Sequence, residues 1–100
     1  MKRYLVAPGA QDDLRQVWRY LFEVAGFEVA EKIEGEFFDV FQGLADVPGK
    51  GHKRSDLTAR GVLFFVVYQY MIVYRQSVPL EIVAVLHGKR DLRRLLKTRI

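Results

Sequence analysis

The feature that most constrains the fold is a run of strand-forming residues in the second half of the chain, "VLFFVVYQYMIVYRQSVPLEIVAVLH". It is rich in Val, Ile, Phe and Tyr, which favour extended structure because branched and aromatic side chains pack well on a pleated surface. The run is interrupted at Gln69 and again at a Ser-Val-Pro turn. It therefore predicts three consecutive strands joined as a mainly antiparallel meander. The predicted strands cover residues 62–67, 70–76 and 80–87.

The first half of the chain has the periodicity of helices. A short apolar segment, "RYLVA" at residues 3–7, predicts one further strand, and the Pro-Gly pair after it predicts a turn. From Ala10, apolar residues recur at spacings of three and four, which is typical of a helix with one buried face. Asp12 and Asp13 are expected in the first turn of this helix, where the helix dipole favours carboxylates.

A second apolar stripe runs from Phe27 to Val47 and ends at another Pro-Gly pair, because proline cannot continue the hydrogen bonds of a helix. The two helices are expected to form an antiparallel hairpin whose segments Leu14–Leu21 and Ile33–Leu44 cover one face of the sheet. The stripes consist of Leu14, Val17, Trp18, Leu21, Phe22 and Ala25 in the first helix and Ala30, Ile33, Phe37, Val40, Phe41 and Leu44 in the second.

The chain ends in a short basic segment that predicts a third helix from about Arg90. Leu92, Leu95 and Leu96 fall on one side of it, and Arg93, Arg94, Lys97 and Arg99 fall on the others. The predicted order is thus β-α-α-β-β-β-α. This order indicates an α+β fold, in which a helical hairpin packs on a mainly antiparallel four-stranded sheet and a short C-terminal helix follows. One hundred residues are expected to form a single domain, residues 1–100.

Composition excludes several classes of protein. The absence of cysteine removes disulfides and thiolate chemistry. The N-terminus lacks the long apolar region of a signal peptide, and no stretch approaches the roughly 20 apolar residues of a membrane span. The two histidines lack partners at metal-ligand spacing, and "PGKGHKRS" does not have the spacing of a phosphate-binding loop. We therefore expect a small soluble cytoplasmic domain with no metal, cofactor or membrane association.

Charge is divided unevenly along the chain. Residues 1–50 hold six Lys/Arg and nine Asp/Glu, a net charge of −3, whereas residues 51–100 hold ten Lys/Arg and three Asp/Glu, a net charge of +7. This division indicates a basic face built from the second half of the chain. Nucleic acid or an acidic protein surface is the natural partner for such a face.

The stretch "VAVLHGKRDLRRLL" places a histidine at the end of the last predicted strand, next to basic residues. Tyr74 and Arg75 end the strand before it, and we expect the antiparallel neighbours to bring these ends together with His87 and Arg90. Loop residues Lys53 and Arg54 are expected to approach them. Acid–base cleavage of RNA needs groups that transfer protons and cations that stabilise the phosphate, and this set contains both.

Structural explanations for the same residues remain open. His87 could cap the turn or hydrogen-bond Asp91, and Arg90 could pair with Asp91 to fix the corner between strand and helix. The tyrosines of the strands, Tyr68, Tyr70 and Tyr74, are more often half-buried packing residues than catalytic groups. A nucleophilic triad of Ser55 or Ser77 with His87 and Asp91 has no support from spacing.

Four segments carry a resemblance to a known family: "APGAQDDLRQVWRYL", "LADVPGKGHKRSDL", "YQYMIVYR" and "IVAVLHGKRDL". In these segments, which occur in the family's order and span nearly the whole chain, the sequence resembles the ParE branch of the RelE/ParE superfamily of toxins from bacterial toxin–antitoxin systems. The resemblance implies a helical hairpin on an antiparallel sheet with a C-terminal helix, which agrees with the order predicted from periodicity.

The resemblance implies two alternative activities. ParE-type members poison DNA gyrase and are not thought to be enzymes, whereas RelE-type members enter the ribosomal A site and cut mRNA. The glycine after His87, followed by Arg90-Asp91, is similar to the ParE pattern, and Arg75 is the single charge on the middle strands. We therefore expect a gyrase inhibitor that is not an enzyme, with a ribosome-dependent endoribonuclease as the alternative.

Each interpretation assigns its own residues. On the ParE interpretation, the target-binding residues are His87, Lys89, Arg90, Arg93, Arg94 and Lys97. On the nuclease interpretation, the catalytic residues are His87, Arg75, Tyr74 and Arg90. The resemblance also implies a cognate antitoxin that folds across the toxin and forms a toxin–antitoxin hetero-oligomer with it.

Overall fold

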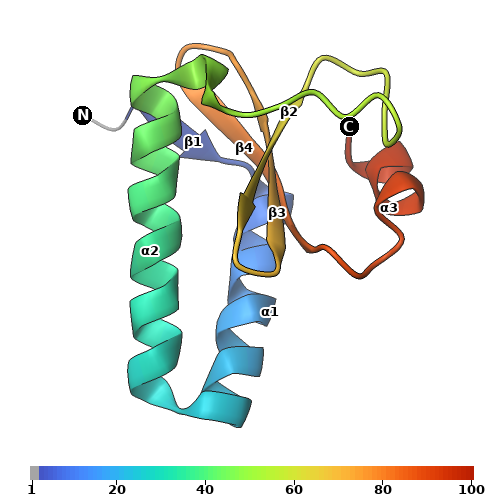
Figure 1. Ribbon diagram of the computed structural model, residues 1–100. Helices are drawn as coiled ribbons and strands as arrows, with labels where there is room; N and C mark the ends of the chain where they lie inside the picture. Colours follow the sequence, from blue (N-terminus) through green and yellow to red (C-terminus); the bar gives the residue numbers. More distant parts are fainter. Residues whose placement is uncertain (1–2) are drawn as a thin grey trace.

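The computed structural model describes residues 3–100 and contains the predicted elements in the predicted order (Figure 1). The elements are β1 (Tyr4–Val6), α1 (Pro8–Ala25), α2 (Phe27–Asp46), the 3-10 helix η1 (Pro48–Lys50), β2 (Leu63–Val67), β3 (Tyr70–Arg75), β4 (Leu80–His87) and α3 (Leu92–Arg99). The predicted α+β class is confirmed.

The four strands form one mixed sheet in the order β1-β4-β3-β2. β2 and β4 each pair antiparallel with β3, as the meander predicts, and β1 pairs parallel with β4, with Tyr4 opposite Leu80. The hairpin of α1 and α2 and the strands β2 and β3 lie between β1 and β4 in the sequence. This connection is long enough for the crossover that a parallel pair of strands requires. β1 and β2 are therefore the edges of the sheet.

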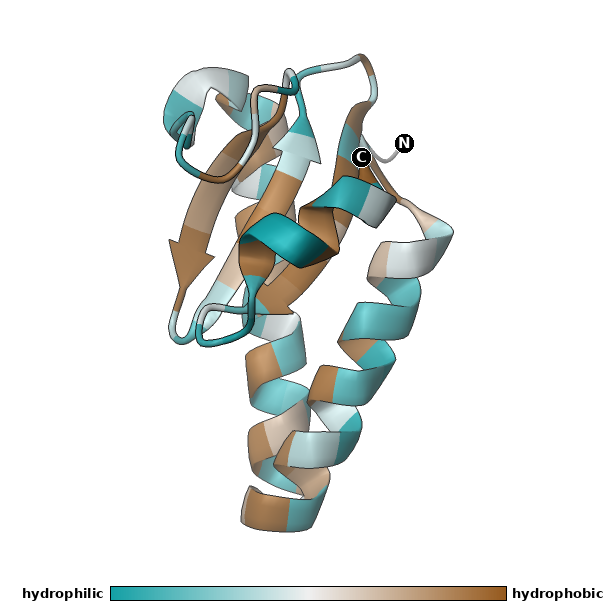
Figure 2. Ribbon diagram, turned by 90° about the vertical axis from the view of Figure 1, so that its right-hand side faces the viewer, coloured by the Kyte–Doolittle hydropathy of each residue, from teal (hydrophilic) through white to brown (hydrophobic). Residues whose placement is uncertain are grey.

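Each face of the sheet has its own apolar cluster. The helical hairpin covers one face, where Phe37 and Phe41 of α2 pack with Ile72 of β3 and Ile82 of β4. The other face is covered by α3 and the segment before β2, as seen in Figure 2, where α3 crosses in front of the strands. The sheet is thus the middle layer, with the hairpin on one side and α3 on the other.

The far end of the hairpin extends beyond the sheet (Figures 1 and 2). Phe22 and Phe27 are 47% and 58% exposed there, and Trp18 is half-buried. Trp18 stacks on Phe22 with ring centroids 5.3 Å apart, and its Nε1–H donates a hydrogen bond to Glu31. The expectation that this part of the first stripe packs on the sheet is therefore wrong, because Trp18 faces α2 and the end of the hairpin, where its partners are Phe22, Phe27 and Glu31.

The start of α1 also differs from the prediction. The first Pro-Gly pair does not form a turn; Pro8 is the first residue of the helix, where its missing N–H is not needed for a helical hydrogen bond. Asp12 and Asp13 consequently lie beyond the first turn, and the expected interaction with the helix dipole is wrong for both. Asp12 pairs with Arg15 on the surface, whereas Asp13 points at the sheet.

Asp13 closes the outer edge of β4 beyond the end of β1. Val83 has no partner in the register of β3, so it forms a bulge that turns the Val85 N–H toward this edge. Asp13 Oδ2 accepts that N–H at 2.9 Å, and it also accepts a bond from Arg99 Nη2 at 2.7 Å. A Cβ atom at Gly9 would lie 2.9 Å from Arg99 Nη2, so the glycine leaves room for the guanidinium. One carboxylate thus joins α1, β4 and α3.

We predict that Asp13→Ala lowers the free energy of unfolding by about 2–3 kcal/mol, because it leaves a buried backbone N–H without an acceptor and Arg99 without its partner. The neighbouring Asp12→Ala is the matched control and should change stability by less than about 0.5 kcal/mol, since its ion pair with Arg15 is exposed. Urea denaturation measures both values. Equal effects of the two substitutions would contradict the role given to Asp13.

Candidate functional site

The structure separates the residues of the predicted nuclease set. His87 pairs with Tyr70 at the start of β3, not with its end. Tyr74 and Arg75 lie four and five residues further along β3, roughly 13–17 Å away at about 3.3 Å per residue. The expectation that these strand ends converge is therefore wrong, since antiparallel neighbours bring the end of one strand to the beginning of the other.

Tyr74 has a structural position instead. Its ring is buried in the core beneath the hairpin, its hydroxyl donates to the Pro48 carbonyl oxygen at 2.7 Å, and it accepts the Gly51 N–H at 2.8 Å. Burial raises the pKa of the Tyr74 hydroxyl. A Cβ atom at Gly51 would come within 2.6 Å of this hydroxyl and 2.8 Å of the Phe64 carbonyl oxygen. The tyrosine and the glycine together hold the start of the loop that follows α2.

Arg75 lies at the same end of the sheet and is likewise occupied. Its Nε donates to Glu81 Oε1 at 3.1 Å across the β3–β4 pair, and both side chains are about 40% exposed. Cross-strand pairs of opposite charge stabilise a sheet modestly. Its charge is thus balanced locally rather than offered to a phosphate.

His87 caps the turn between β4 and α3, as one of the structural explanations predicts. Its Nδ1 accepts the Lys89 N–H at 3.1 Å, and its carbonyl oxygen accepts the Arg90 N–H at 3.0 Å. Asp91 caps α3 by accepting the Arg94 N–H at 3.2 Å. Neither the bond from His87 to Asp91 nor the pair of Arg90 with Asp91 occurs within the described residues 3–100.

His87 lines a cavity of about 330 Å³ between α1 and the end of the sheet. Tyr20, Tyr70 and Arg90 also line this cavity, so the structure brings together two of the predicted nuclease residues and adds two tyrosines. Tyr70 packs edge-on against His87 with ring centroids 5.5 Å apart. Asp13 lines the same cavity, but its carboxylate is balanced by Arg99. Arg90 is then the one cation that lines the cavity within residues 3–100, and a single arginine is a poor cage for a pentavalent phosphate.

The predicted target-binding cations form a continuous exposed segment of the turn and α3. We call Lys89, Arg90, Arg93, Arg94 and Lys97 the C-terminal basic surface; all five are exposed. Among residues 3–100, none of them forms a salt bridge, whereas five arginines elsewhere do. The paired arginines are Arg3, Arg15, Arg54, Arg75 and Arg99. The cations of this surface therefore keep their full charge for a partner.

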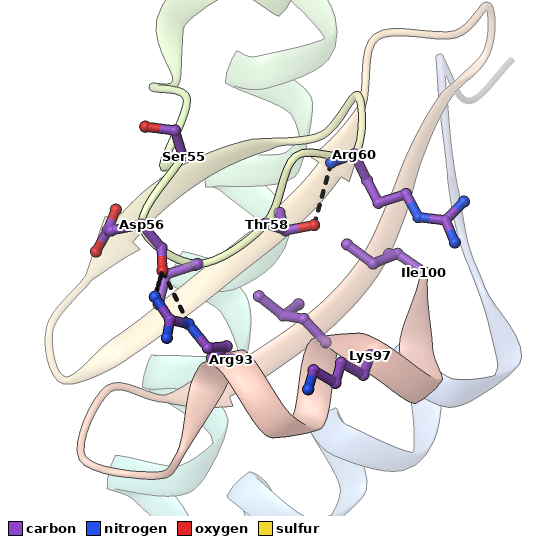
Figure 3. A pocket seen from close by; sticks show the side chains of 9 residues that line it. Ser55, Asp56, Thr58, Arg60, Arg93, Lys97 and Ile100 are labelled. Atoms are coloured by element: carbon purple, nitrogen blue, oxygen red, sulfur yellow. Dashed lines mark hydrogen bonds between the residues drawn. The ribbon is translucent and has the colours of Figure 1, made fainter.

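The loop before β2, residues 51–62, extends this surface (Figure 3). The sequence did not predict that this loop lies beside α3. Arg93 donates through Nε and Nη2 to the Asp56 carbonyl oxygen, at 3.2 and 2.8 Å. The bond fixes the loop beside α3 and brings in Arg60. The loop thus contacts α3 through Asp56, with which Arg54 pairs, and no hydrogen bond or ion pair within residues 3–100 joins Lys53 or Arg54 to His87. No spacing rule links Arg60 with Arg93, since the two are far apart in sequence.

Comparisons with known proteins identify related chains. A family model described as the ParE toxin of the type II toxin–antitoxin system parDE matches residues 4–92, which include His87, Lys89 and Arg90 and end before Arg93. Toxin ParE1 of Caulobacter vibrioides is 30% identical over 93 residues, which are 93% of this chain and 96% of that protein. A solved chain of the chromosomal ParDE TA system from P. aeruginosa has the same fold, with a TM-score of 0.74 at 17% identity, over 86% of this chain and 95% of that one.

Within residues 3–100, no helix is both long and apolar enough to cross a membrane.

We predict that Tyr74→Phe lowers the free energy of unfolding by about 1–2 kcal/mol, because it leaves the Pro48 carbonyl and the Gly51 N–H without their shared partner. The pKa of Tyr74 is raised in the folded state, so its contribution is complete below about pH 10 and is lost as the pH rises through the folded pKa. The variant should therefore lose less stability than the wild type between pH 10 and pH 12. Urea denaturation across this range tests both statements, with the exposed Tyr20→Phe as control.

Proposed function

The chain belongs to the ParE toxin family of type II toxin–antitoxin systems, and from this premise we propose that it inhibits DNA gyrase in the cytoplasm and is neutralised by a cognate antitoxin that binds it directly. The proposed action is stoichiometric binding rather than catalysis. The observation that carries the proposal is the C-terminal basic surface, whose cations are exposed and lack ion pairs within residues 3–100.

The arrangement of the sheet supports a binding protein over a nuclease. Tyr74 and Arg75 are engaged at the end of the sheet opposite His87. His87 holds a turn through its Nδ1, and the carboxylate of Asp13 shares its cavity. Acid–base cleavage of RNA would need several cations around the phosphate, and this cavity offers Arg90 alone. The ribosome-dependent endoribonuclease remains the alternative that the experiment below must exclude.

We place the antitoxin in a groove beside β1, on the hairpin side of the sheet. The groove has a volume of about 490 Å³, and Leu5, Leu14 and Phe38 line it. Phe38 is 38% exposed although it is a large aromatic residue. β1 is an edge strand, so an antitoxin segment can extend the sheet there while its apolar side chains enter the groove. A partly disordered segment with acidic and apolar residues would fit both this groove and the basic half of the chain.

For the antitoxin, we expect the association rate to fall on the order of tenfold between low and high salt, while the dissociation rate changes much less. Long-range steering by charge is screened by salt, whereas contacts in an apolar groove are not. Phe38→Ala, which shortens a partly exposed side chain of the groove without changing the charge, should have the opposite signature, with faster dissociation and nearly unchanged association. Surface plasmon resonance with the purified antitoxin measures both rates. Association that does not depend on salt would remove charge from the explanation.

For the target, we expect the triple variant Arg93→Glu, Arg94→Glu and Lys97→Glu to lose inhibition of gyrase supercoiling. His87→Gln should retain most of the inhibition, because on this proposal His87 holds the turn before α3 and takes part in no chemical step. Removal of an acid–base residue lowers the rate of an enzyme by about 10²–10⁴, so the nuclease alternative predicts that His87→Gln nearly abolishes mRNA cleavage. Each variant is assayed with purified gyrase and with programmed ribosomes.

The matched control is the double variant Arg19→Glu and Lys32→Glu, which reverses two exposed cations of the hairpin. It should inhibit gyrase like the wild type. Circular dichroism of every variant separates loss of function from loss of fold. Robust cleavage of A-site mRNA by the wild type, without any effect on supercoiling, would overturn the proposal.

A further inference from the structure

A second cavity lies between the loop before β2 and α3, on the opposite face of the sheet from the antitoxin groove (Figure 3). Its volume is about 340 Å³. Leu57, Leu96 and Ile100 supply apolar atoms to its wall, and all three belong to the apolar cluster beneath α3 or pack against it. The cavity is thus a hollow at the surface of that cluster, large enough for one large aliphatic or aromatic side chain.

Cations surround this hollow. Figure 3 shows Arg60 and Arg93 at opposite ends of the cavity and Lys97 between them on α3. The guanidinium of Arg93 is held by a neutral acceptor, the Asp56 carbonyl oxygen, so the side chain is fixed in place without losing its charge. Among residues 3–100, neither Arg60 nor Lys97 forms a salt bridge.

Asp56, the acidic side chain that lines the cavity, is already engaged. Arg54 donates two hydrogen bonds to Asp56, at 2.9 and 2.8 Å. These bonds, with a smaller contribution from the charge of Arg93, lower the pKa of the Asp56 carboxyl, which is exposed to solvent. Because Arg54 balances Asp56, no acidic side chain of the lining forms a salt bridge with Arg60, Arg93 or Lys97 within residues 3–100, and these three cations make a positive rim around an apolar hollow.

This combination selects among possible ligands. A small inorganic anion would use the cations but not the apolar wall. A nucleic acid would offer phosphates, but no aromatic side chain among residues 3–100 lines the cavity to stack on a base. A peptide segment that carries one large apolar side chain between carboxylates uses both features, since the apolar side chain fills the hollow and the carboxylates meet the rim.

We propose that the cavity between α3 and the loop is a docking site for an acidic segment of a protein partner, anchored by one large apolar side chain. The proposal goes beyond the function above, because it specifies the chemistry of the bound segment whichever protein carries it. It also adds Arg60, Leu57 and Ile100 to the residues that contact a partner.

The test uses the full chain and a synthetic peptide, so it does not depend on gyrase or on an antitoxin. The peptide has nine residues, with a central leucine flanked by glutamates and a fluorescein label. Anisotropy measures the affinity, and ¹⁵N chemical shifts of the labelled protein locate the site. We expect the shifts to concentrate in residues 55–60 and 92–100. A serine in place of the central leucine should weaken binding at least tenfold.

Protein variants complete the test. Arg60→Glu with Lys97→Glu should weaken the peptide at least tenfold, whereas the control Arg19→Glu with Lys32→Glu should leave its affinity within a factor of two. Ile100→Ala, which removes part of the apolar wall at the end of the chain, should weaken the leucine peptide but not the serine peptide.

Three results would overturn the proposal. Equal affinity for the leucine and serine peptides would show that charge alone binds the segment. Chemical shifts centred on the hairpin or on β1 would place the site elsewhere. Tighter binding of a short DNA duplex, with shifts at the same residues, would assign the rim to phosphates.

Discussion

The fold depends on how the outer edge of β4 is closed. β4 has eight residues and its outer neighbour β1 has only three, so the edge of β4 is open beyond Ile82. An open edge in the middle of a domain leaves backbone groups without partners, which is costly when they are buried. Asp13 and Arg99 fill this gap with side-chain groups in place of a longer strand. β1 can end early and α1 can start at Pro8, because Asp13 of α1 accepts the Val85 N–H that a longer β1 would otherwise pair.

The same interaction explains where the charges lie. Within residues 3–100, Arg99 is the one cation of α3 that forms a salt bridge, and it turns toward the sheet, with its side chain 24% exposed. The remaining cations of α3 point to solvent because the acidic residues of the first half lie mainly on the hairpin, across the sheet. The division of charge along the sequence is thus kept in space by the layer order of the fold, and within residues 3–100 none of the cations of the basic surface forms a salt bridge.

Much of the fold could be predicted because it rests on local patterns. The strands, the hairpin and the third helix follow from periodicity and from residues that end elements, such as Gln69 in the turn between β2 and β3. The candidate site was less predictable, because it depends on register and on distant contacts. The ends of two antiparallel strands lie at opposite ends of the sheet, which separates His87 from Tyr74. No pattern in the sequence pairs Asp13 with Arg99, since the two residues are 86 positions apart.

The position of α3 bears on how an antitoxin would neutralise such a protein. The groove beside β1 and the C-terminal basic surface lie on different faces of the sheet. The salt bridge between Asp13 and Arg99 joins α1 on one face to α3 on the other. The molecule is at most 37 Å across, so an extended segment on the order of 10–15 residues would reach from the groove to α3. An antitoxin of that reach could anchor its apolar part in the groove and lay its acidic part on the cations. Neutralisation by direct occupation then requires no second conformation of the toxin, whereas an allosteric route would need one that the antitoxin binds preferentially.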